Sequence, residues 1–127
     1  MKAYIAARFN QKDQTLDIAR KLKDRGYDFI SDWTSHKSIK PYEQNSEMAQ
    51  QYAIEDVDGT RNTDLFILIS DEAGTGMYVE LGAAIASNLM SGKPKIYVIG
   101  NQLDRSMFYF HPTVNRRNTI EDVLKEI

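Results

Sequence analysis

The segment Asp64-Leu-Phe-Ile-Leu-Ile-Ser70 restricts the possible folds most, because five consecutive apolar residues stand between two polar ones. A strand with one buried face alternates apolar and polar residues, whereas an uninterrupted apolar run is typical of a parallel strand covered on both faces. Residues 3–7 form a further short run of this kind, and residues 95–99 form another strand, whose apolar run follows Lys95. The chain is therefore expected to contain a parallel sheet with helices on both faces.

Helical patterns alternate with these short runs. In the first pattern, Leu16, Ala19 and Leu22 lie on one stripe, and Gly26 is a typical C-terminal stop. Thr119 is the expected N-cap of a closing helix. Helices are expected over residues 14–25, 46–59, 77–90 and 119–127, strands over 3–7, 27–33, 64–70, 95–99 and 107–110, and a long loop over 34–45.

Strands that alternate with helices are wound by right-handed crossovers, and five strands in this length favour a flavodoxin-like order. The expected fold is α/β, a doubly wound five-stranded parallel sheet with the order 2-1-3-4-5. A chain of 127 residues suits one domain, so residues 1–127 are expected to form it alone.

Composition excludes several classes of function. The net charge of -2 argues against a nucleic-acid polymer as partner, although small phosphorylated ligands stay possible. The chain has no cysteine, and its two histidines, His36 and His111, stand far apart, so neither a metal site nor a cofactor is expected. No apolar run approaches the roughly 18 residues of a membrane span, and the N-terminus lacks a signal-peptide pattern, which predicts a cytoplasmic protein without a membrane partner.

Ligands of open parallel sheets bind beyond the carboxyl ends of the strands, where the winding reverses. That crevice lies between the first and third strands and is flanked by Arg8-Phe9-Asn10 and by Asp71–Gly76. Arg8 could hold an anion by a bidentate contact or be a solvated loop residue. Gly74, Thr75 and Gly76 could bring backbone N–H groups to a phosphate or sugar, or the glycines could only permit a tight turn.

Two further residues of this region have open roles. Trp33 could stack on a base or form an aromatic edge of the core. Asp71, like its neighbour Glu72, could bind substrate or be a solvated turn residue.

Glu80 interrupts a helix that is apolar around most of its circumference. It is expected in the first turn, where the helix dipole favours the ionised form, as suits a nucleophile or an electrostatic stabiliser. Acidic residues also occupy first turns for stability alone, where they contribute roughly 0.3–1 kcal/mol.

Two more residues have polar groups on apolar surfaces. The phenol of Tyr4 lies mid-strand and could bond to Glu80 or only fill core space. Asp56 shares the apolar side of its helix with Met48 and Tyr52, and needs a partner there unless the helix end frays. If this helix runs straight to Asn62, the Asp56 carboxylate lies only about 8 Å above the far end of the sheet, so a kink or tilt is expected.

Together, Tyr4, Asp56 and the segment Gly76-Met-Tyr-Val-Glu-Leu-Gly-Ala-Ala84 resemble the nucleoside 2-deoxyribosyltransferases and the related nucleoside 5′-monophosphate N-glycosidases. The resemblance spans nearly the whole chain. It implies that Glu80 attacks the anomeric carbon and forms a covalent glycosyl intermediate, that Tyr4 orients this carboxylate, and that Asp56 contacts the sugar or protonates the departing base. Such a double displacement retains the anomeric configuration. The resemblance also implies a homo-oligomer whose site a neighbouring subunit completes.

One departure from the family concerns the 5′ end of the sugar. Where relatives have an acidic residue or serine six positions before the nucleophile, this chain has Gly74. The first hypothesis is therefore a transferase that exchanges a free base on a nucleoside or nucleotide. The second, favoured by Arg8 and Gly74, is a nucleoside 5′-monophosphate N-glycosidase, with NAD glycohydrolysis as a variant by analogy of fold. The third is a nucleotide sensor in which Glu80 only binds ribose hydroxyls.

Overall fold

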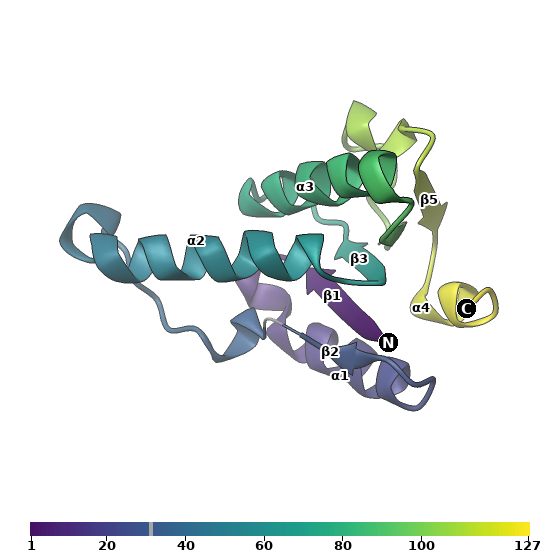
Figure 1. Ribbon diagram of the computed structural model, residues 1–127, viewed down its shortest axis with the longest axis horizontal. Helices are drawn as coiled ribbons and strands as arrows, with labels where there is room; N and C mark the ends of the chain where they lie inside the picture. Colours follow the sequence, from purple (N-terminus) through teal and green to yellow (C-terminus); the bar gives the residue numbers. More distant parts are fainter. Residues whose placement is uncertain (31) are drawn as a thin grey trace.

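The computed structural model describes residues 1–30 and 32–127, and in these residues five strands form one parallel sheet (Figure 1). The order β2-β1-β3-β4-β5 confirms the predicted flavodoxin-like order 2-1-3-4-5. Every residue of β3 is buried, as its uninterrupted apolar run predicts for a central strand. The strands are β1 (Lys2–Ala6), β2 (Asp28–Phe29), β3 (Leu65–Ile69), β4 (Lys95–Ile99) and β5 (Val114–Arg117).

The predicted helices are all present, and their ends differ from the predicted ones by at most three residues. Thr119 is confirmed as an N-cap, because its side chain accepts a hydrogen bond from the Asp122 N–H. No helix in residues 1–30 and 32–127 has both the length and the apolar character of a membrane span. The helices are α1 (Lys12–Lys23), α2 (Ser46–Arg61), α3 (Gly76–Ser91) and α4 (Ile120–Leu124).

The helices cover the sheet in two layers (Figure 1). On one face, Ile18 and Leu22 of α1 and Val123 of α4 pack against the strands. On the other face, Leu81 and Ala84 of α3 pack against the opposite side chains of the same strands. Helix α2 runs beside α3, and its N-terminal part extends past the sheet.

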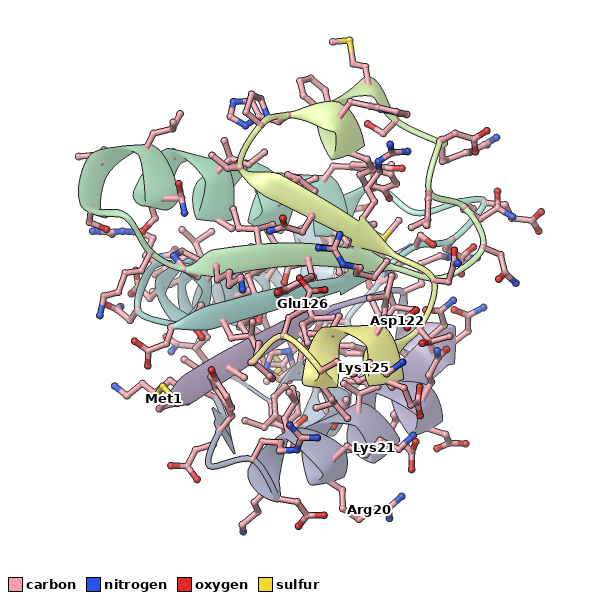
Figure 2. All side chains as sticks on the ribbon, turned by 90° about the vertical axis from the view of Figure 1, so that its right-hand side faces the viewer. Met1, Arg20, Lys21, Asp122, Lys125 and Glu126 are labelled. Atoms are coloured by element: carbon pink, nitrogen blue, oxygen red, sulfur yellow. The ribbon has the colours of Figure 1, made fainter. Side chains whose placement is uncertain are left out.

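Helices α1 and α4 are joined by polar contacts at the surface of their layer (Figure 2). The Lys21 ammonium lies 2.9 Å from the Glu121 carboxylate, and the Arg25 guanidinium donates to the Leu124 carbonyl at 2.7 Å. These contacts hold together the helix layer that covers the face of the sheet opposite α2 and α3.

The predicted fifth strand at Met107–Phe110 is wrong. This segment forms a 3-10 helix, and β5 follows it at Val114–Arg117. A four-residue apolar run does not distinguish a strand from a helical turn. Here the Ser106 side chain accepts from the Phe108 N–H and starts the turn, and of the four residues only Tyr109 is buried.

The second strand is shorter than predicted. A strand was expected over Tyr27–Trp33, but β2 contains only Asp28 and Phe29. Asp32 caps a 3-10 helix that begins at Trp33, which takes the chain out of the sheet. Residue 31 of the expected strand lies outside the described residues.

Candidate active site

A cavity of about 700 Å³ opens between α2, the start of α3 and the segment that follows β2. Only Phe9 and Gly76 come from the two loops that were expected to flank it. The cavity therefore extends from the predicted crevice along α2. Its walls consist of Ala7, Phe9, Trp33, His36, Lys37, Ser38, Ile39, Lys40, Tyr42, Ala49, Tyr52, Ala53, Asp56, Val57, Gly76, Val79 and Glu80.

Tyr4 and Glu80 meet at the inner end of this cavity. The Tyr4 hydroxyl donates a short hydrogen bond to Glu80 Oε2. Tyr4 itself is fully buried in the middle of β1, opposite Phe66 of β3, whereas Glu80 is a wall residue of the cavity. The strand thus holds a phenol beneath the carboxyl group and fixes its orientation.

Asp56 reaches the same end of the cavity from α2. Asp56 and Glu80 both interact with Tyr4, which lies at mid-strand and not at the carboxyl edge of the sheet, so the site does not need the kink or tilt that would carry Asp56 to that edge. Asp56 Oδ1 is buried and has no hydrogen-bond partner among the described residues. A buried acceptor without a hydrogen-bond partner destabilises the folded protein, so its presence needs an explanation. A donor group on a bound ligand would supply the missing hydrogen bond.

Burial dominates the electrostatics of this group. Desolvation is the main cause that raises the pKa of Glu80 from 4.5 to about 8. The hydrogen bond from Tyr4 lowers this pKa, and the charge of Asp56 raises it further. Desolvation also raises the pKa of Asp56 and that of Tyr4. Burial of both carboxyl groups thus favours the protonated forms of Glu80 and Asp56 over the ionised forms.

Burial therefore opposes the ionised form of Glu80 that was expected from its place in the helix. The first turn of α3 contains no acidic residue, because the helix begins at Gly76 and Glu80 is its fifth residue. The helix dipole acts mainly within the first turn, and the desolvation of the carboxyl group outweighs it here.

His36 and Tyr52 form an aromatic wall that the sequence argument missed. Their rings are parallel with centroids 3.7 Å apart, and His36 Nε2 lies 3.2 Å from Glu55 Oε2. The position of Tyr52 four residues before Asp56 placed it on the correct side of α2. The position of His36 in a long polar loop gave no such signal.

The two other aromatic residues of the wall differ in exposure. Trp33 is buried, and its indole N–H donates to the Ile5 carbonyl at 2.6 Å. Phe9 is 56% exposed, and its ring centroid lies 6.1 Å from that of Trp33. Phe9 therefore offers more surface to a ligand than Trp33, which mainly closes the core.

Arg8, Asp71, Gly74 and Thr75 are not among the described wall residues of this cavity, and Asp71 lines a second cavity at the carboxyl ends of β3 and β4. Arg8 Nη1 lies 3.3 Å from Asp71 Oδ1, and the Gln11 amide donates to Asp71 Oδ2 at 2.8 Å. These contacts hold the turn before α3 against the end of β1. A cluster of three or more potential metal ligands is absent from residues 1–30 and 32–127.

No protein-family model and no curated protein sequence matches the chain. Among solved structures, the CMP N-glycosidase BcmB of Clostridium botulinum superposes with a TM-score of 0.63. The alignment covers 99% of this chain and 97% of that chain at 19% sequence identity. The two proteins share a fold. The resemblance to this class of proteins, predicted from the motifs, is confirmed at that level.

Proposed function

We propose that the protein cleaves the N-glycosidic bond of nucleoside 5′-monophosphates, with Glu80 as the nucleophile. One observation carries the proposal: Glu80 is oriented by the buried Tyr4 at the wall of a cavity that Asp56 also enters. The fold shared with a CMP N-glycosidase supports it.

The productive form has a proton on Asp56 and the charge on Glu80, to which the Tyr4 hydroxyl donates. A Glu80 oxygen attacks C1′ of the pentose, and the bond between C1′ and the base nitrogen breaks. The electron pair of that bond goes to the base, which takes the proton from Asp56. The products of this step are a glycosyl ester of Glu80 and a neutral free base.

Water completes the reaction. The Asp56 carboxylate accepts a proton from a water molecule that attacks C1′ and releases Glu80. The free sugar phosphate leaves with retained configuration, as in retaining glycosidases. Asp56 thus acts first as an acid and then as a base, which suits a carboxyl group with a raised pKa.

The 5′-phosphate fits the start of α3. Gly76 is the first residue of this helix and a wall residue of the cavity. The Thr75 side chain makes no capping hydrogen bond, and the Tyr78 N–H donates to the Thr75 carbonyl at 3.1 Å. The Gly76 and Met77 N–H groups are therefore the first-turn donors that we assign to the phosphate oxygens. We propose that Arg8 acts indirectly, by holding the turn through Asp71.

Base transfer is the second candidate function, favoured by the motif resemblance. In that reaction a free base, and not water, attacks the glycosyl ester. Incubating the protein with dCMP and free adenine distinguishes the two, because a transferase forms dAMP whereas a hydrolase forms deoxyribose 5-phosphate.

The direct test measures base release from CMP, dCMP, AMP and the corresponding nucleosides by chromatography. We expect release from the nucleotides, and a loss of at least about 10³-fold in kcat for Glu80→Gln. Glu72→Gln is the matched control, because Glu72 is an exposed carboxylate in the turn before α3. If the wild-type protein binds nucleotides without releasing base, the protein is a sensor and the proposal is wrong.

A further inference from the structure

The charges in the cavity wall are segregated. Its two carboxyl groups, Asp56 and Glu80, lie at the inner end. Lys37 and Lys40 belong to the wall segment of residues 36–42, whose described wall residues include no acid. We call the part of the cavity between this segment and Ala49 its outer end. Neither lysine forms an ion pair with another described residue, in contrast to Arg8, which pairs with Asp71.

The outer end lies too far from the inner end for a base alone to span the cavity. Asp56 and Ala49 both belong to the wall and are separated by seven residues of α2, or about 10 Å at the helical rise. A purine is shorter than this from its glycosidic nitrogen to its opposite edge. A nucleotide whose C1′ contacts Glu80 therefore leaves the outer part of the cavity unfilled.

The walls between the two ends are apolar. Ala49 and Ala53 face the cavity from α2 and leave room beside the stacked His36 and Tyr52 rings. At the outer end Tyr42 is 54% exposed, and Lys40 Nζ lies 5.9 Å from its ring centroid. The outer part thus combines apolar walls with an unpaired cationic rim.

We propose that this outer part, lined by Lys37, Ile39, Lys40, Tyr42 and Ala49, is a subsite for a substituent on the leaving base. The substrate class is a nucleotide whose base carries a substituent that ends in a carboxylate. A substituent on the base edge opposite the glycosidic nitrogen points away from C1′. With C1′ at Glu80, such a substituent would extend along α2 toward the two lysines. The 5′-phosphate stays on the sugar side, near Gly76. This inference rests on the proposed function.

The test compares three nucleotides that share one base: AMP, N6-butyl-AMP and N6-(1,2-dicarboxyethyl)-AMP. We expect kcat/KM for the dicarboxylate to exceed that for AMP at least about fivefold. This factor corresponds to the upper end of the free-energy range of one exposed ion pair. The butyl compound should gain less, because it lacks the charge. The preference should weaken at high salt, which screens exposed charges.

The variant Lys37→Gln/Lys40→Gln should reduce kcat/KM for the dicarboxylate at least fivefold more than for AMP. Lys125→Gln is the matched control, because Lys125 is an exposed lysine on the opposite side of the sheet. A dicarboxylate preference that survives the double substitution overturns the subsite.

The outcomes separate the subsite from the proposed function. Cleavage of AMP or CMP without a preference for the dicarboxylate overturns the subsite and leaves the proposed function intact. If no nucleotide is cleaved, the proposed function fails, and calorimetric binding of the same three compounds decides the subsite. CMP and N4-carboxymethyl-CMP provide the same comparison for a pyrimidine-specific enzyme. The subsite is wrong if the carboxylate-bearing nucleotide binds no more tightly than the unsubstituted nucleotide with the same base.

Discussion

Tyr4 has a fixed position because its ring is fully buried and stacks on Phe66, with the ring planes 3° apart and the centroids separated by 6.0 Å. Only its hydroxyl reaches the carboxyl groups above the sheet. A rigid donor of this kind stabilises the charge that Glu80 needs for attack, and it costs no reorganisation at that moment. The phenol itself stays protonated, because desolvation raises its pKa.

The carboxyl pair predicts an alkaline limit to activity. Burial raises the pKa of Glu80 to about 8 and also raises the pKa of Asp56, so at high pH both groups ionise and no acid is left to protonate the base. We expect kcat/KM with CMP to fall tenfold per pH unit above pH 8. Tyr4→Phe removes the hydrogen bond that lowers the pKa of Glu80, so the fall should begin at a higher pH. Initial rates between pH 5 and 10 check both statements, and a fall that begins at a lower pH in Tyr4→Phe contradicts them.

Asp56 is expected to matter only when the base needs a proton. Asp56→Asn should lower kcat for GMP by about 10²- to 10⁴-fold, the usual contribution of general acid catalysis. N7-methyl-GMP carries a cationic base that leaves as a neutral molecule, so its hydrolysis should lose far less in the same variant. Paired measurements on the two substrates test this role. An equal loss on both would mean that Asp56 only binds the sugar.

At the scale of elements, the turn between β3 and α3 depends on a glycine. Gly74 has φ +101°, and a Cβ at this position would lie 2.8 Å from Arg8 Cγ. Gly74→Ala should therefore destabilise the protein by about 1–3 kcal/mol and displace Arg8. Denaturant unfolding measures the change in the free energy of unfolding.

Gly82→Ala is the matched control for this substitution. Gly82 lies inside α3, and a Cβ there meets no atom within 4 Å. Alanine is the better helix former, so this variant should be more stable by about 0.5–1 kcal/mol. Equal stability of the two variants would show that the turn relaxes around a side chain.

The elements that the sequence predicted correctly are those with strong local patterns. The apolar run of β3 depends on neighbouring residues alone. The α1 stripe was predicted in part: Ala19 and Leu22 are buried, whereas Leu16 is 41% exposed and Ile18 is buried instead. Met107–Phe110 failed, because a short apolar run fits either secondary structure and only the surrounding packing decides. The short β2 failed because Asp32 caps a new turn, and a capping aspartate before an aromatic residue is a weak signal.

The candidate site was predicted in part for a similar reason. Tyr4, Asp56 and Glu80 were found through motif positions, and the structure places Asp56 and Glu80 in one wall with Tyr4 beneath it. His36 and Lys40 were missed, since a loop without periodicity does not reveal which element it packs against. The raised pKa of Glu80 was also missed, because desolvation depends on the whole fold and the helix dipole depends on one helix.

At the scale of the whole molecule, apolar side chains remain exposed on the side of the sheet that carries the cavity. Met90 of α3 is 88% exposed and Met107 is 77% exposed. The two segments belong to one layer, because the Tyr109 hydroxyl lies 3.3 Å from that of Tyr78. Exposed apolar surface of this kind is typical of protein interfaces. Val79 is both exposed and a cavity wall residue, so an interface here would extend to the substrate.

We therefore expect a symmetric homo-oligomer that uses this layer. In analytical ultracentrifugation, the wild-type protein should sediment as a dimer or larger species, and Met107→Glu should weaken association by at least about tenfold, because it buries a charge in an apolar contact. Leu16→Glu is the matched control, since Leu16 is an exposed apolar residue of α1 on the opposite face. If the partner completes the cavity near Val79, the specific activity of Met107→Glu should also fall on dilution over the range where the oligomer dissociates. A monomeric wild-type protein with full activity would contradict the interface and assign the complete site to one chain.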